Sequence, residues 1–210
     1  MEKHNRPFLI AITGGIASGK TLVSKWFAEQ GFDVYSTDKI AHEIINETEV
    51  IQKITQLFGP EIMIDQRINR KKLGEIVFDD SANLEQLNSI MHPLVYNEMN
   101  NLILLSKASC LVFEIPLLFE NGLQNAFDLT INISADKELQ IMRMKKRDNL
   151  MEEEILQRVE SQMSDFDKQK LADINITNNA TEREMFIKLE NLLPLIQKLK
   201  KKDIEELLKI

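Results

Sequence analysis

The fold is decided by the stretch Gly14-Gly15-Ile16-Ala17-Ser18-Gly19-Lys20-Thr21, which matches the pattern GxxxxGK(S/T) of phosphate-binding loops. The apolar run Phe8–Thr13 precedes it and reads as a buried parallel strand, apolar on both faces. A helical pattern follows from Lys20 to about Gln30, and Gly31 stands where a glycine commonly ends a helix. Because this strand–loop–helix order is the context in which the pattern binds phosphates, we predict a nucleoside triphosphate site, with ATP as the expected ligand.

Each residue type in the loop has a physical role. Glycines let the backbone wrap closely around a phosphate chain, because no Cβ intervenes. Successive N–H groups then face the anion, aided by the positive end of the following helix. Lys20 is expected to neutralise charge on the β- and γ-phosphates, and the Thr21 hydroxyl to ligate Mg²⁺. The competing interpretation, a glycine-rich structural turn, is weaker because a strand and a helix flank the loop.

The composition is that of a globular protein without specialised segments. The 210 residues carry 26 Lys+Arg against 33 Asp+Glu, a formal net charge of -7, which argues against broad nucleic-acid binding. No apolar run reaches the roughly 18 residues of a membrane span, and the start of the chain does not read as a signal peptide. The single cysteine, Cys110, excludes an internal disulfide and a multi-cysteine metal site. We therefore expect a cytoplasmic protein with no membrane association and no obligate protein partner.

Further short apolar runs alternate with helical patterns along the chain. We expect strands at Asp33–Ser36, Cys110–Ile115, Leu129–Ile133 and, more weakly, Ile174–Ile176. Together with Phe8–Thr13 they predict an α/β protein with a parallel five-stranded sheet flanked by helices.

The helical patterns between these strands differ in length. From Asp38 most of the chain up to the third strand reads as helical, including a helix from Ser81 toward Ser106 that Pro93 should kink or restart. Ser134 is expected to cap the helix after the fourth strand, with Asp136 in its first turn. Another helix should begin near Asn149, and the last thirty residues read as helical and charged. The strand-free segment 148–170 is either a mobile lid or a solvated helical pair on the core.

Two carboxylates follow predicted strands and could take part in chemistry. Asp38 lies just beyond the second strand, and the carboxyl ends of parallel strands meet at the edge that carries the phosphate loop. It could accept or orient a proton from an acceptor hydroxyl, or help to hold Mg²⁺; the alternative is a helix cap. Glu114 ends the third strand, where it is either associated with Mg²⁺ or satisfied by buried neighbours.

The loop alone does not name a reaction, because GTPases, ATPase motors and small-molecule kinases all use it. An Asn-Lys-x-Asp motif for reading guanine is missing from the sequence, and the chain is short for a motor. A small-molecule kinase is the best interpretation. The rivals are another kinase acting on a nucleoside, nucleotide or metabolite, and a non-catalytic ATP-dependent regulator.

With these elements the sequence resembles the dephospho-CoA kinase family, from about residue 8 to about residue 195. The loop itself is generic, whereas the Pro-Leu-Leu-Phe-Glu segment and the order of the other elements are specific. The segments that carry the resemblance are Thr13–Lys20, Asp38-Lys39-Ile40-Ala41-His42, His92-Pro93, Glu114–Glu120, Gln140, Arg143, Arg147-Asp148, Ala172-Asp173 and Asn178-Asn179.

The resemblance implies ATP-dependent phosphorylation of the ribose 3′-hydroxyl of dephospho-CoA. It also implies a P-loop nucleotide-kinase-like core, formed here by residues 1–37, 108–147 and 171–210. A helical acceptor region would comprise residues 38–107, and a helical lid residues 148–170. Asp38 takes the place of the carboxylate usually credited with catalysis, while Ser36 replaces an acidic residue that many members carry.

Further roles rest on the resemblance together with helical spacing. Gln140, Arg143 and Arg147 fall on one helical face. Arg143 could meet the transferring phosphoryl group, and Arg147 could bind the ATP phosphates or tie the lid to the core; a surface charge run is the alternative. Arg158 and Gln162 repeat such a pair as weaker candidates. The expected acceptor contacts, each weighed against a structural role, are His42, His92, Pro116 and Leu117, with Asp38.

Overall fold

The computed structural model describes residues 6–78, 80–148, 151–204 and 207. Its contacts divide the chain into two compact units, one formed by residues 1–36 and 103–210 and the other by residues 37–102. The first unit therefore contains the phosphate loop, and the second begins directly after the second strand. The predicted helix near Asn149 begins at Glu152, and Asn149 itself lies outside the described residues.

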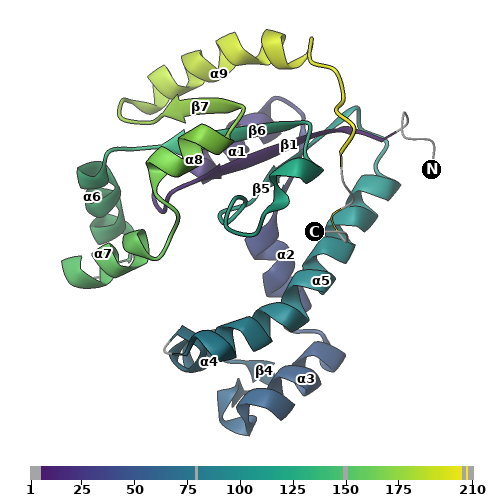
Figure 1. Ribbon diagram of the computed structural model, residues 1–210, viewed down its shortest axis with the longest axis vertical. Coiled ribbons are helices and arrows are strands. Elements are labelled where there is room, and N and C mark those ends of the chain that lie inside the picture. The colour runs from purple at the N-terminus through teal and green to yellow at the C-terminus, as the bar shows by residue number, and fades with distance from the viewer. Residues whose placement is uncertain (1–5, 79, 149–150, 205–206, 208–210) are drawn as a thin grey trace. The chain divides into compact units, whose positions relative to one another are not determined.

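The first unit is built on a sheet of five parallel strands in the order β2-β5-β1-β6-β7 (Figure 1). This confirms the predicted parallel five-stranded sheet flanked by helices. The strands are β1 (Phe8–Gly14), β2 (Asp33–Ser36), β5 (Cys110–Glu114), β6 (Leu129–Ser134) and β7 (Ile174–Thr177). The helices of this unit are α1 (Lys20–Glu29), η2 (Leu123–Ala126), α6 (Lys137–Asp148), α7 (Glu152–Glu160), α8 (Asp165–Leu171) and α9 (Glu182–Ile196).

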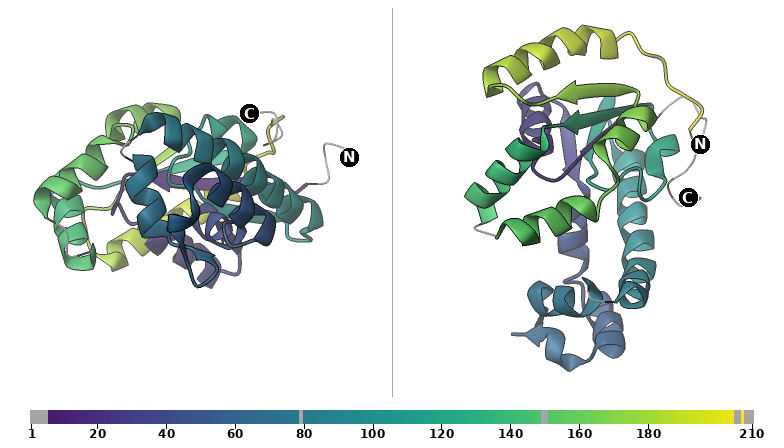
Figure 2. Two further views of the ribbon diagram at one scale, coloured as in Figure 1. Left: turned by 90° about the horizontal axis from the view of Figure 1, so that it is seen from below. Right: turned by 60° about the vertical axis from the view of Figure 1, so that its left-hand side comes forward.

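The core of this unit lies between the sheet and two helices. β1 is buried over its whole length, because it is the central strand and both of its faces are covered. Its residues Phe8, Ile10 and Ile12 form one cluster with apolar side chains of α1 and α9. In Figure 1, α8 lies in front of the sheet, where it contacts β6. The helices α6 and α7 pack against each other (Figure 2).

The second unit is mostly helical, with one small hairpin. Its elements are α2 (Thr37–Ile44), α3 (Thr48–Phe58), η1 (Pro60–Ile62), β3 (Met63–Ile64), β4 (Arg67–Ile68), α4 (Arg70–Phe78) and α5 (Ser81–Leu105), whose last residues belong to the first unit. The antiparallel hairpin β3–β4 was not predicted. Its turn residues Asp65 and Gln66 both have positive φ. Because neither is a glycine, the sequence lacks the usual signal for such a turn. α5 runs through Pro93 as a single helix, so it does not restart there.

Two helix predictions are wrong. Ser134 is the last residue of β6, and its hydroxyl lies 3.3 Å from that of Thr177 on β7, so it does not cap α6, which begins at Lys137. The end of the chain is not helical throughout, because α9 ends at Ile196 and residues 199–204 have no regular structure. Within the described ranges, none of the helices combines the length and hydropathy of a membrane crossing.

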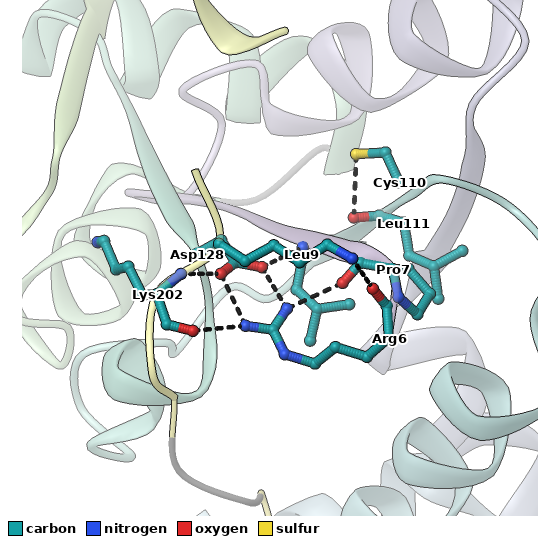
Figure 3. A network of polar contacts seen from close by, with 8 residues as sticks. Arg6, Pro7, Leu9, Cys110, Leu111, Asp128 and Lys202 are labelled. Atoms are coloured by element: carbon teal, nitrogen blue, oxygen red, sulfur yellow. Dashed lines mark hydrogen bonds and ion pairs between the residues drawn. The ribbon is translucent and has the colours of Figure 1, made fainter. Parts of the chain in front are cut away.

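Asp128 ties both ends of the described chain to the sheet (Figure 3). Its side chain is fully buried at the start of β6 and accepts hydrogen bonds from the Arg6 guanidinium, from Leu9 N at 2.8 Å and from Lys202 N at 2.6 Å. Lys202 also pairs with Asp173 at 2.9 Å. The irregular segment after α9 is therefore fixed by a buried carboxylate that accepts several hydrogen bonds.

We predict that Asp128→Ala lowers the free energy of unfolding by about 3–5 kcal/mol, because it leaves the donors of a buried charge network without an acceptor. The matched control Asp33→Ala removes an exposed carboxylate at the start of β2 and should change stability by less than about 0.5 kcal/mol. Urea denaturation of the full chain measures both. Equal, small losses in the two variants would contradict this role of Asp128.

Candidate active site

The phosphate loop connects β1 to α1, as its sequence predicts. Residues 15–19 form the turn, and Lys20 is the first residue of the helix. Ala17 has φ 55° and Gly19 has φ 103°, so the backbone twice enters the left-handed region. Alternation of right- and left-handed residues makes successive N–H groups converge on a concavity that suits an anion. The local backbone therefore has the form of an anion-binding loop.

Two side chains from other elements hold the loop by its carbonyl groups. Asn178, just after β7, donates its amide Nδ2 to Ser18 O at 2.7 Å. Arg143, on α6, donates Nη1 to Ala17 O at 3.3 Å and Nη2 to Asn178 O at 2.8 Å. Because carbonyl and N–H point to opposite sides of a peptide, fixing the carbonyls outward leaves N–H groups for the concavity.

Lys20 also contacts the loop. Its ammonium donates to Gly14 O at 3.0 Å and to Gly15 O at 2.9 Å, so its charge lies at the beginning of the loop. Lys20 is partly buried, which strengthens its attraction for a phosphate compared with an exposed lysine. This position fits the predicted role of charge neutralisation.

Thr21 and Glu114 form the part of the site that suits a metal ion. The Thr21 hydroxyl donates to Glu114 Oε1 at 2.9 Å, which brings together two hard oxygen ligands beside the loop. In the described ranges there is no group of three or more His, Cys, Asp or Glu side chains placed to hold a metal. The residues fit Mg²⁺, because that ion is usually held by one or two carboxylates together with water and substrate phosphates.

Asp165 approaches the loop from α8. A Cβ added at Gly15 would lie 3.0 Å from Asp165 Oδ1 and 2.7 Å from Gln140 Nε2, so both side chains end close to the backbone of the loop. Burial raises the pKa of the Asp165 carboxyl, although Lys168, Lys20 and the Ala135 N–H act in the opposite direction. This half-buried carboxylate was not predicted, because residues 165–171 have the pattern of an ordinary charged helix.

The turn after β5 lies next to the loop's strand. Ile115 N donates to Ile12 O at 2.8 Å, and the Thr13 hydroxyl donates to Pro116 O at 3.2 Å. Leu117 is exposed, while Leu118 and Phe119 are buried. The turn is therefore anchored on both sides of Leu117, which stays accessible; its predicted contact with the acceptor stays a prediction.

The remaining acceptor candidates lie in the second unit. Asp38 is exposed in the first turn of α2. His42 Nδ1 accepts a hydrogen bond from Arg70 Nη1 at 2.6 Å, because a guanidinium can only donate. His92 stacks on Tyr96 with ring centroids 5.5 Å apart, and burial lowers its pKa. A neutral His92 at pH 7 suits a hydrogen-bonding role better than a charge-pairing role.

The structure thus brings together only part of the predicted set. The loop residues, Gln140 and Arg143 converge, whereas Arg147 lies exposed in the last turn of α6 and its contact with ATP phosphates stays a prediction. Thr21 and Asp38 belong to different units, so their shared metal role also stays a prediction. Asn178 was known only as part of a motif. The available signal was its position at the carboxyl end of β7, a strand of the same parallel sheet that lies two places from β1.

Comparison with known proteins identifies the family to which this site belongs. The family model described as dephospho-CoA kinase matches residues 8–184. The chain belongs to the dephospho-CoA kinase family. A dephospho-CoA kinase from Fusobacterium nucleatum is 40% identical over 189 residues, which is 90% of this chain and 98% of that protein. One from Oceanobacillus iheyensis is 40% identical over 190 residues, covering 88% and 96% of the two chains.

Solved structures agree with this assignment. The dephospho-CoA kinase from Campylobacter jejuni matches with a TM-score of 0.66 and 30% identity, covering 88% of this chain and 96% of that one. A Thermus thermophilus protein matches with a TM-score of 0.82 and 30% identity, covering 91% and 98%. A shikimate kinase from Acinetobacter baumannii, 20% identical with a TM-score of 0.54, covers 92% and 96% and shares the fold.

We predict that Gly19→Ala weakens ATP binding at least about tenfold, a loss of about 1.4 kcal/mol or more. The new Cβ would lie 2.1 Å from Asn178 Nδ2, so the contact that holds Ser18 must break, at a residue with φ 103°. Gly31→Ala is the control, because its φ is 86° and no atom lies within 4 Å of the added Cβ. It should cost about 1–2 kcal/mol of stability and leave ATP affinity unchanged. Equal ATP affinities by calorimetry would contradict the role of Asn178.

A second prediction concerns the pH dependence of stability. The raised pKa of Asp165 means that folding favours its protonated form. This contribution to the free energy of unfolding is complete below the ordinary pKa of about 3.9 and is lost as pH rises through the raised pKa. The stability of the native protein relative to Asp165→Asn should therefore fall as pH rises above about 4.

Asp167→Asn provides the control of opposite sign on the same helix. Hydrogen bonds from Ser164 and Lys170 lower the pKa of Asp167, so its effect is present above about pH 3.9 and lost as pH falls through the lowered pKa. Denaturation across pH measures both differences. A flat or rising difference for Asp165→Asn would refute the burial of an ionisable carboxyl at the loop.

Proposed function

We propose that the protein transfers the γ-phosphoryl group of ATP to the ribose 3′-hydroxyl of dephospho-CoA, giving coenzyme A and ADP, the last step of coenzyme A biosynthesis. The observation that carries the proposal is the P-loop with its Thr21–Glu114 pair, in a chain of the dephospho-CoA kinase family. Neither a shared fold nor the loop alone would name this acceptor.

ATP binding is assigned to the loop residues 14–21. Their backbone N–H groups and the Lys20 ammonium would take the β- and γ-phosphates, as in other proteins with this loop. Arg143 holds the loop carbonyls, and we keep for it the additional role of stabilising charge on the transferring phosphoryl group. Arg147 is assigned to the ATP phosphates on the strength of the family pattern.

Mg²⁺ is the expected metal, with Thr21, Glu114 and Asp38 as the protein groups that would hold it. The fit rests on the hydroxyl and carboxylate oxygens that lie 2.9 Å apart at Thr21 and Glu114. When bound, the ion supplies positive charge that offsets the phosphate oxygens. All other steps below are assigned to the side chains of this chain.

Asp38 is the group that we assign to the acceptor hydroxyl. In an in-line transfer the 3′-oxygen forms a bond to the γ-phosphorus while the bond from that phosphorus to the β–γ bridging oxygen breaks. The hydroxyl proton passes to Asp38 and then to solvent, and the electron pair of the broken bond stays on ADP. His42, His92, Pro116 and Leu117 are assigned to positioning dephospho-CoA, because positioning supplies much of the rate in such reactions.

The second unit, residues 37–102, would then be the acceptor region, close to the predicted range 38–107. The helices α7 and α8 fall in the predicted lid, residues 148–170, whose closure would exclude water from the transfer. A cytoplasmic location and action without a protein partner remain predictions from the sequence.

We predict that ADP release by the protein depends on dephospho-CoA and not on nucleoside monophosphates or shikimate. Lys20→Ala should abolish turnover with the free energy of unfolding retained. Asp38→Asn should lower kcat at least about 100-fold while changing ATP affinity little, because proton transfer contributes about 10²–10⁴-fold. A coupled assay for ADP with this acceptor panel measures all three.

Two controls accompany this assay. Lys25→Ala on α1 and Glu43→Gln on α2 change exposed charges and should keep kcat within about twofold, since exposed substitutions have small effects. Turnover with a nucleoside monophosphate but not with dephospho-CoA would favour another small-molecule kinase. ATP binding without any acceptor-dependent ADP would favour a regulator, and either result contradicts the proposal.

A further inference from the structure

Gln162, between α7 and α8, contacts the phosphate loop directly. Its side-chain Oε1 accepts a hydrogen bond from Ile16 N at 2.9 Å, across 146 positions of sequence. Ile16 is the third residue of the loop, so the donor is one of the backbone N–H groups that an anion would use. An amide oxygen is the uncharged counterpart of a phosphate oxygen, because both accept hydrogen bonds from such donors.

Two more charged side chains lie at the beginning of the loop. The Lys20 ammonium donates to Gly14 O and Gly15 O at 3.0 and 2.9 Å. Asp165 Oδ1 would lie 3.0 Å from a Cβ added at Gly15, so a carboxylate oxygen stands at the beginning of the loop. Gln162 and Asp165 belong to the same stretch, residues 162–168, which we call the loop cover.

The loop cover is anchored by Glu120, at the end of the turn that follows β5. Glu120 Oε1 accepts a hydrogen bond from Met163 N at 3.1 Å, and it pairs with the ammonium of Lys168 at 2.8 Å. The Lys168 side chain is fully buried, so the position of α8 is tied to this ion pair. The hydrogen bond from Met163 N to Glu120 therefore fixes the backbone next to Gln162, whose side chain reaches the loop.

This anchor is incompletely satisfied. In the described part of the chain, Lys168 Nζ and Glu120 Oε2 are buried atoms without a hydrogen bond of good geometry, although the ion pair places the two charges together. Burying charges has a desolvation penalty that an ion pair with few hydrogen bonds repays poorly. The position of the loop cover therefore depends on an ion pair that has few further hydrogen bonds.

We propose that Gln162 is a resident ligand of the phosphate loop, which an ATP phosphate must displace when it binds. Binding then requires the loop cover to leave Ile16 N, and the measured affinity is the intrinsic affinity multiplied by the fraction of molecules whose loop is uncovered. Gln162 lowers ATP affinity in this arrangement, whereas a residue of the ATP site would raise it. The inference rests on the proposed function only in taking ATP as the ligand.

The test is calorimetric titration of the full chain with ATP and Mg²⁺, without an acceptor. Gln162→Ala and Gln162→Met should bind ATP about two- to tenfold more tightly, because each removes one hydrogen bond that competes with the ligand. The Met variant keeps the length of the side chain, so packing of the loop cover is retained. Gln169→Ala, an exposed glutamine on α8, should leave the affinity unchanged.

Amide hydrogen exchange gives a second readout that a merely structural role would not produce. Without ATP, the Ile16 amide should exchange slowly in the native protein and at least about twofold faster in both Gln162 variants. ATP should protect Ile16 in all of them and speed exchange at the Met163 amide, whose bond to Glu120 must open.

Weaker or unchanged ATP binding in both Gln162 variants would overturn the inference, as would ATP-independent exchange at Met163. The outcome is separable from the proposed function. A native protein that binds ATP but does not phosphorylate dephospho-CoA would refute the function and leave the loop cover testable. A native protein that phosphorylates dephospho-CoA, with weaker ATP binding in Gln162→Ala, would refute only the loop cover.

Discussion

The hydrogen bonds from Asn178 and Arg143 to the carbonyls of the phosphate loop are the interaction on which the site depends. Lys20 fixes the carbonyls at the beginning of the loop, but those of Ala17 and Ser18 are held by side chains from outside the loop. The sheet order supplies the means, because β6 is paired with β1 and β7 with β6. Asn178 follows β7 and Arg143 lies on the helix after β6, which brings both to the loop.

The same arrangement explains how an acidic protein provides an anion site. The net charge of -7 describes the whole surface, whereas phosphates respond to charges within about one Debye length, about 8 Å at physiological ionic strength. Lys20 and Arg143 both contact loop carbonyls. Among the N–H groups of the loop, Ile16 N donates to Gln162 Oε1 at 2.9 Å. The loop cover and a phosphate would thus compete for this donor.

Local signals in the sequence predicted most of the first unit. The strand–loop–helix pattern of residues 8–29 and the strand Asp33–Ser36 appear in the structure, because short apolar runs and glycines favour these elements locally. Predictions failed where tertiary pairing decides the outcome. Ser134 has the chemistry of a helix cap, but pairing of β6 with β7 extends the strand through it. The hairpin β3–β4 turns at Asp65-Gln66 without a glycine, so it gave no signal.

The site was predictable to the extent that its residues follow strands. Glu114 could be expected near the loop because it ends β5, and it does meet Thr21. Contacts made by α7, α8 and the residues between them were not predictable, because helical spacing shows which residues share a face but not what that face meets. Gln162 and Asp165 reach the loop through the packing of α8 on β6 and the buried pair Lys168–Glu120. Neither contact has a local signature.

Phosphorus NMR and mass spectrometry of the products formed from ATP and dephospho-CoA determine which oxygen atom receives the phosphoryl group. We predict one ADP for each molecule of coenzyme A, with the new phosphomonoester on the ribose 3′-oxygen and no product from the Lys20→Ala protein. ADP formed without a phosphorylated acceptor, or a phosphate attached at another position, would contradict the account.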